Sequence, residues 1–254
     1  MNLEKSSNPV LSEKMFEKAQ SLPAEMPMTL QGTINKTLLM FVLLVLGAYY
    51  TWSNFFDAAT LQSATTAMWP WMIGSGIVGF ILAIVISFKP NVSPYLAPLY
   101  AIVEGLFLGA ISAFFQAMYP GIVFQAVGLT LAVFFLMLFA YKTNVIRATP
   151  KFTKIIIMAT LGIGVFYLVS FVLSLFGVNM GLMYGNSNLS IIISLVIVGI
   201  AALNLILDFD FIERASDMGA PKYMEWYGAF GLMVTIIWLY VEILRLLSKL
   251  SSRN

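Results

Sequence analysis

Apolar residues along this chain fall into seven long runs that are separated by short polar breaks. Each run holds about 20 residues, the length that an α-helix needs to cross the hydrocarbon of a bilayer. The breaks contain the proline, glycine and asparagine residues that end helices or form turns. This pattern predicts an all-α membrane protein, a bundle of seven transmembrane helices near residues 38–55, 68–88, 98–118, 121–141, 155–176, 189–211 and 227–247.

The composition supports a chain that is solvated by lipid. Hydrophobic residues make up 60% of the 254 residues and charged residues only 10%, whereas soluble domains carry about 25% charged residues. One compact membrane domain accounts for the length. We therefore expect a polar N-terminal segment over residues 1–36, followed by a seven-helix transmembrane domain over residues 37–250.

The lysine and arginine residues predict the orientation of the helices. With the N-terminus in the cytoplasm, the inner segments hold eleven of these 14 residues and the outer ones three. Cytoplasmic loops are usually the more basic ones, so this orientation is the expected one. The discordant residues lie at the end of the chain, where either the last helix is re-entrant or a short tail breaks the rule. We favour a full span for the helix that precedes Arg245, Lys249 and Arg253.

Several function classes are excluded by residues that the chain lacks. Cysteine and histidine are both absent, which removes disulfides, thiol nucleophiles and Cys/His metal sites. A serine protease usually needs a histidine base, and the G-x-G-D sequence of an intramembrane aspartyl protease is missing. Phosphate loops, dinucleotide fingerprints and nucleic-acid-binding motifs are missing too. We expect a protein that is not an enzyme and needs no cofactor.

Five charged side chains interrupt the apolar runs, and four of them are acids. An ionised group in the hydrocarbon costs at least roughly 2.5–3.5 kcal/mol, so such groups usually face a cavity or each other and mark an ion or proton pathway. The five residues are Glu104, Asp208, Asp210, Glu242 and Arg245.

Two of the acids lie near the inner end of the sixth helix. Asn204 and Asp208 are four residues apart and share a helix face. Asp210 points elsewhere. Either these acids only begin the polar loop that follows, or Asp208 belongs to a buried polar site together with Asn204.

The other two acids lie on the third and the last helix. Glu104 comes six residues after Pro98, roughly 9 Å into the membrane. It is either an interfacial acid or part of the pathway, and the Gly105-x-x-x-Gly109 spacing beside it allows a close helix contact. Glu242 lies deepest, and Arg245 at i+3 can pair with it. That pair either ties helices together or accompanies a contact of Glu242 with Asp208.

Carboxylates that meet in a low-dielectric bundle have a distinctive chemistry. Two of them cannot both ionise cheaply, so they share one proton over a wide pH range. They bridge two helices while the proton is bound. Once both are ionised they form an oxygen-lined site that suits a hard cation such as Ca²⁺. A proton-gated cation leak follows from these residues, and a proton-coupled transporter would use the same ones.

Several stretches of the chain resemble a known family. They are SSNPVLSEKMFEKA and MTLQGTINKTLL before the first helix, SPYLAPLYAIVEGLFLGAISAFF in the third, and NLILDFDFIERASDMGAPKYMEWYGAFGLMVTIIWLYVEILRLL across the last two. The chain resembles the Bax inhibitor-1 (transmembrane Bax inhibitor motif) family, most closely its bacterial YccA-like members. The resemblance covers nearly the whole chain and is most specific in the last third.

The resemblance implies a pair of acids as the gate. In the family an Asp on helix six, often within Asp-Thr-Gln, pairs with an acid in a Leu-Tyr-x-Asp motif on a central seventh helix. Asp208 takes the first position, and Glu242, within Leu239-Tyr240-Val241-Glu242, takes the second. Asp208 and Glu242 are thus the candidate gate and Ca²⁺ ligands. The accessory cation-pathway residues are Glu104, Asp210 and Asn204, and Arg245 is the counter-charge.

Family members are pH-sensitive Ca²⁺ leak channels, and some are reported to bind and restrain a membrane protease. Related channels carry a basic latch on helix two, whereas residues 68–88 contain no lysine or arginine. Lys89 or Arg245 could replace it. We expect a monomeric, pH-sensitive Ca²⁺ leak in a bacterial plasma membrane, with lipid, protons and Ca²⁺ as partners. The alternatives are a protein that regulates a membrane protease through its N-terminal tail, and a proton-coupled transporter.

Overall fold

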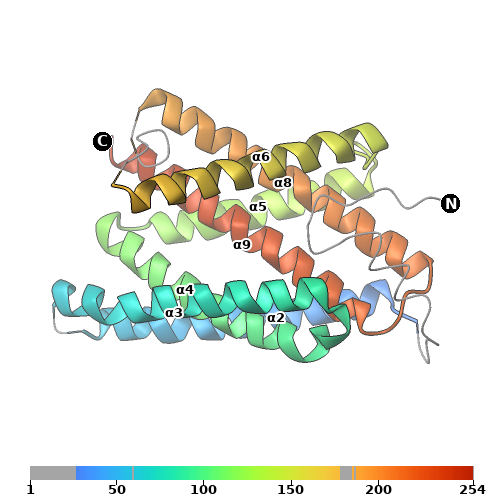
Figure 1. Cartoon of the computed structure of the whole chain (residues 1–254), viewed down its shortest axis with the longest axis horizontal. Helices are drawn as coiled ribbons and strands as arrows, with labels where there is room; N and C mark the ends of the chain where they lie inside the picture. Colours follow the sequence, from blue (N-terminus) through green and yellow to red (C-terminus); the bar gives the residue numbers. More distant parts are fainter. Residues whose placement is uncertain (1–26, 59, 178–184, 186, 254) are drawn as a thin grey trace. The chain divides into compact units, whose positions relative to one another are not determined.

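The structure is a computed structural model, and it describes residues 27–58, 60–177, 185 and 187–253. Seven of the helices in this part of the chain are long and apolar enough to cross a membrane, which confirms the predicted seven-span, all-α fold. In chain order they are α2 (Leu30–Phe56), α3 (Leu61–Phe88), α4 (Ser93–Met118), α5 (Ile122–Lys142), α6 (Pro150–Leu175), α8 (Asn188–Asp217) and α9 (Met224–Ser251), with the short 3₁₀ helix η1 (Pro90–Val92) before α4 (Figure 1).

Two of the predicted helix starts lie several residues too late, beside or at a proline. Helix α3 begins at Leu61, where Thr60 and Ser63 form a capping box, so Pro70 lies inside the helix. Helix α4 begins at Ser93 and contains Pro98. Neighbouring polar groups and local adjustments allow proline inside membrane helices. Glu104 is consequently eleven residues from the start of α4, about 16 Å along its axis instead of roughly 9 Å.

Helix α2 begins within the segment that was assigned to the polar tail. Its first residue is Leu30, and Thr29 caps it by accepting a hydrogen bond from the amide of Gly32. The part of residues 1–36 that precedes Pro27 lies outside the described residues.

The chain divides into two compact units. Within the described residues, one unit comprises residues 121–210 and 235–253, and we call it the α5–α6 unit. The other comprises residues 27–120 and 211–234, and we call it the α2–α4 unit. Helices α8 and α9 are divided between the units, and each contributes one part to the α5–α6 unit and the other part to the α2–α4 unit.

In the α2–α4 unit, α4 packs against both α2 and α3. Its contact with α2 is made by Gly105 and Gly109, where an added Cβ would collide with the backbone carbonyls of Leu44 and Ala48. Small residues at this spacing let two helix backbones approach closely in a membrane. The Thr51 hydroxyl uses this closeness to donate a hydrogen bond of 3.0 Å to the carbonyl of Leu106.

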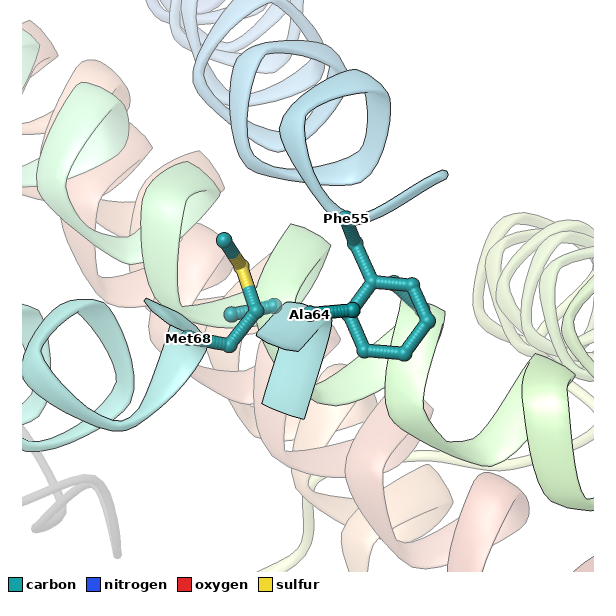
Figure 2. Close-up of a cluster of buried hydrophobic side chains, with 5 residues drawn as sticks. Phe55, Ala64 and Met68 are labelled. Atoms are coloured by element: carbon teal, nitrogen blue, oxygen red, sulfur yellow. The ribbon is translucent and has the colours of Figure 1, made fainter. Parts of the chain in front are cut away.

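A buried apolar cluster joins the same three helices near the Asp57–Thr60 connection. Figure 2 shows Phe55 of α2 beside Ala64 and Met68 of α3, and Ala110 and Ala113 of α4 complete the cluster. All five side chains are buried. Three alanines on two of the helices leave room for the Phe55 ring, so the cluster packs the end of α2 against α3 and α4.

In the α5–α6 unit, α8 packs against α5 and α6. Phe209 of α8 meets Phe134 of α5 edge-on, with ring centroids 5.7 Å apart. Ile206 and Leu207 of α8 form a cluster with Ile156 of α6. Helix α6 otherwise exposes large apolar side chains. Only 11% of its most apolar stretch of 18 residues is buried, whereas 61% of the corresponding stretch of α9 is buried. Much of α6 is therefore open to lipid, whereas α9 is largely buried.

Candidate functional site

The second half of α9 carries three charged residues on one face. Glu242, Arg245 and Lys249 follow the i, i+3, i+7 spacing, which places side chains one above another along a helix. Glu242 is 1% exposed and Lys249 is 5% exposed. This face meets α6 and α8 within the α5–α6 unit.

The Glu242 carboxylate is bound from two sides. The Tyr167 hydroxyl of α6 donates a hydrogen bond of 2.6 Å to its Oε1. Arg245 Nη1 lies 3.1 Å from Oε1 and 3.2 Å from Oε2. Arg245 Nη1 also donates to the Tyr167 hydroxyl at 2.9 Å, and its guanidinium lies over the Tyr167 ring at 5.3 Å. The three side chains form a closed triangle, which we call the Glu242 lock.

The lock places an ion pair inside a membrane-spanning segment. Buried charges are tolerated when they are paired and hydrogen-bonded, and removing one partner then leaves an uncompensated charge. The negative charge of Glu242 is matched by Arg245, and its hydrogen bonding is completed by Tyr167. One carboxyl group thus joins α9 to α6 through Tyr167 and pairs with Arg245 of its own helix.

Lys249 lies one turn beyond Arg245 and is bound by α8. Its ammonium group donates hydrogen bonds of 2.8 Å to both Ser190 Oγ and Ser194 Oγ, and lies 3.4 Å from the carbonyl of Ser190. An ammonium has three donors, so all three are used on neutral oxygens. Arg253 continues the series by donating to Asn188 Oδ1 at 2.6 Å.

Sequence reasoning missed Lys249 and its serine partners. It counted Lys249 as part of a basic tail beyond the membrane. The signal that could have revealed the site is the helical spacing of Lys249 from Glu242 and Arg245. Ser190 and Ser194 carry the matching spacing of one helix turn on α8.

On α8, Asn204 and Asp208 are both buried, and Asp208 is 0% exposed. The Asn204 amide donates to Thr160 Oγ1 of α6 at 2.9 Å and to the carbonyl of Ile200 at 2.8 Å. Helix α8 continues to Asp217, so Asp208 and Asp210 lie inside a helix and do not begin a loop. Asp210 is partly exposed.

The predicted site residues are distributed over the two units. Glu242, Arg245, Asp208, Asp210 and Asn204 belong to the α5–α6 unit. Glu104 belongs to the α2–α4 unit, where the Tyr100 hydroxyl one turn before it binds its carboxylate. The pairing of Asp208 with Glu242 stays a prediction, as do the accessory cation roles.

A second charged cluster, also missed from the sequence, lies at the start of α9 in the α2–α4 unit. The fully buried Glu225 carboxylate forms ion pairs with Lys36 of α2 and with Lys222, the latter at 2.7 Å. It also accepts hydrogen bonds from the amide of Thr29 at 2.9 Å and from its hydroxyl at 3.0 Å. We call these residues the Glu225 clasp. It attaches the start of α2 to the start of α9.

No preformed cage for a metal ion occurs within residues 27–58, 60–177 and 187–253. Groups of three or more Asp, Glu, His or Cys side chains that could hold an ion are not found there. Ca²⁺ takes six to eight oxygen ligands when it is bound as a resident ion.

Comparison with known proteins identifies the family of the chain. Residues 8–252 match the model of the family described as Bax inhibitor 1 like. Neither a curated protein nor a solved structure gives a significant match. The matched region contains all seven spans, including the helices that carry Asp208 and Glu242. The chain is therefore a multi-pass membrane protein that belongs to the Bax inhibitor 1 like family.

Proposed function

We propose that the protein is a proton-regulated cation leak that passes Ca²⁺ across a bacterial plasma membrane, as a monomer with its N-terminus in the cytoplasm. The observation that carries this proposal is the Glu242 lock, a buried carboxylate whose charge determines its hydrogen bonds to α6 and to Arg245. Membership of the Bax inhibitor 1 like family supports it.

The lock converts proton binding into a change of helix contacts. While Glu242 is ionised, it attracts Arg245 and accepts the hydrogen bond from Tyr167. A proton on Glu242 removes the attraction to Arg245, so the guanidinium loses its counter-charge. The bonds that join α6 to α9 weaken, and α9 becomes free to shift. Asp208, fully buried on α8, is the second proton acceptor of the proposed pair.

The same acids provide the attraction for a cation. Carboxylate oxygens are the ligands that hard cations such as Ca²⁺ prefer. A pathway needs contacts that are strong enough for entry and weak enough for release. Asp208 and Glu242 meet this need as single carboxylates, because each contributes charge without completing a cage. Protons and Ca²⁺ then compete for the same oxygens.

Ca²⁺ flux into liposomes that contain the purified full-length protein tests the proposal. Wild-type protein should pass Ca²⁺ at a rate that changes with pH. Glu242→Gln and Asp208→Asn should each remove or displace that pH dependence. Asp57→Asn is the control, because Asp57 is an exposed acid at the end of α2. Unchanged pH dependence in both variants would exclude the pair from gating.

The competing function is regulation of a membrane protease through the N-terminal tail. Purified protein alone would then pass no Ca²⁺, and deletion of residues 1–26 would abolish regulation while the acid variants would not. Substrate-dependent proton movement in the same liposomes would instead identify a proton-coupled transporter.

A further inference from the structure

Glu104 of α4 rests against a glycine of the neighbouring helix. A Cβ added at Gly79 of α3 would collide with the Glu104 carboxylate, so the absence of a side chain there makes room for the acid. Glu104 is partly buried, and the Tyr100 hydroxyl one turn before it is its hydrogen-bond partner. The Tyr100 ring is itself held edge-on by Phe230 of α9, with centroids 4.8 Å apart.

Along the described helices α2, α3 and α4, Glu104 meets no positive charge that is not already paired. Helix α3 contains no charged residue between Leu61 and Phe88, and Glu104 is the only charged residue of α4. Lys36 is the only one of α2, and it is bound to Glu225. Glu225 is in turn the only charged residue of α9 before Val234.

Glu104 lies far from the aqueous ends of its helix. Helix α4 has 26 residues, and Glu104 comes about 16 Å after its start and about 21 Å before its end. The short glutamate side chain reaches neither end. An ionised carboxylate at this place would be mostly buried beside helices that offer it no unpaired counter-charge, which makes its charge costly.

We propose that Glu104 is a proton-binding site of the α2–α4 unit that holds its proton at neutral pH and titrates independently of the Glu242 lock. This goes beyond the proposed leak and replaces an accessory cation role for Glu104. One protonated carboxyl group and one tyrosine hydroxyl carry no negative charge that would attract Ca²⁺. They are sufficient for a proton, because a neutral carboxyl needs only a hydrogen-bond partner.

A neutral carboxyl group within the membrane reacts with a hydrophobic carbodiimide. The carboxyl oxygen adds to the central carbon of dicyclohexylcarbodiimide while the acid proton moves to a reagent nitrogen, which gives an O-acylisourea. Transfer of the acyl group to the neighbouring nitrogen then yields a stable N-acylurea. The adduct retains every atom of both reactants, and no oxidant or leaving group is involved. Ionised carboxylates do not take this route, so labelling reports the bound proton.

The test treats full-length protein in lipid vesicles with dicyclohexylcarbodiimide at neutral pH and maps the adduct by peptide mass spectrometry. Glu104 should be labelled, and the label should be lost in Glu104→Gln. Gly79→Ala should lower it about tenfold, because its Cβ displaces the carboxyl group. Gly74→Ala on the same helix should label like wild type, because a Cβ there meets nothing within 4 Å.

Several results would overturn the proposal. They are an unlabelled Glu104 in wild type, a label that moves to Glu242 at neutral pH, or an equal loss in Gly74→Ala and Gly79→Ala. Infrared spectra give a readout that does not depend on reactivity or on the glycine variants. The C=O stretch of a protonated carboxyl at neutral pH should be weaker in Glu104→Gln than in wild type and should shift in Tyr100→Phe. Identical spectra would show that Glu104 is ionised. None of these outcomes depends on whether the protein passes Ca²⁺.

Discussion

The Tyr167 hydroxyl on α6 donates a hydrogen bond of 2.6 Å to the Glu242 carboxylate on α9. The two residues are 75 positions apart in the chain. Tyr167→Phe removes this bond and the acceptor of Arg245 Nη1 without changing the ring. A hydrogen bond to a charged group contributes about 1.5–3 kcal/mol, so we expect the free energy of unfolding in detergent to fall by about this amount. Tyr95→Phe is the matched control, because Tyr95 is 80% exposed; an equal loss there would contradict the prediction.

The ion pair between Arg245 and Glu242 predicts a strongly non-additive pair of substitutions. Arg245→Met leaves the buried Glu242 charge without its counter-ion, a change that destabilises proteins by about 3–5 kcal/mol. Glu242→Gln combined with Arg245→Met removes both charges and should recover a large part of that loss. A double-mutant cycle of unfolding free energies measures the coupling. Simple addition of the two single effects would show that the pair does not act as a unit.

Removing the serine partners of Lys249 should destabilise the protein more than removing the charge of Lys249 itself. Ser190→Ala with Ser194→Ala leaves a buried ammonium without two of its acceptors, and each unmade bond costs about 1–3 kcal/mol. Lys249→Met removes the charge and keeps the volume, so it should be far milder. Thermal unfolding in detergent ranks the variants, with Ser174→Ala as a control, because Ser174 is exposed and bonds only to its own helix. A Lys249→Met variant that is as unstable as the double serine variant would be the contrary result.

The Glu225 clasp makes a prediction about a single glycine. A Cβ at Gly32 would collide with the Glu225 carboxylate, so Gly32→Ala should loosen the start of α2. Such overpacking typically costs about 1–3 kcal/mol. Limited proteolysis should cut the variant faster near residue 30 than the wild type. Gly162→Ala, where a Cβ meets nothing within 4 Å, should be cut like the wild type. Equal cutting of Gly32→Ala and wild type would show that the clasp does not hold α2.

Proline shows where local reasoning about the chain fails. Pro98 was taken as the start of the third helix, yet it lies inside α4, and Pro70 lies well inside α3. In water a proline at such a place usually ends a helix, because an amide is missing and a carbonyl is left exposed. In a membrane helix, neighbouring polar groups and small local adjustments satisfy the backbone groups that the proline frees, so the helix continues past it. The depth of Glu104 was underestimated for this reason.

Some contacts of the buried acids could be predicted from the sequence, and others could not. The pairing of Glu242 with Arg245 could be predicted from the sequence, because both residues lie on one helix at a spacing that brings side chains together. The roles of Tyr167 and Gly79 could not be predicted. They are uncharged residues in apolar helices, and nothing in a neighbouring stretch of sequence distinguishes them from residues that face lipid.

The amino-acid sequence alone determined the seven spans, the all-α class and the family resemblance, since each span must keep its own run of about 20 apolar residues wherever it packs. Only the tertiary structure decided which helix contacts each buried ionisable group: α6 contacts Glu242, α8 contacts Lys249 and α3 contacts Glu104. The reason is physical. Hydrophobicity is a property of each residue, whereas a partner for a charge in the membrane depends on which helices are brought face to face.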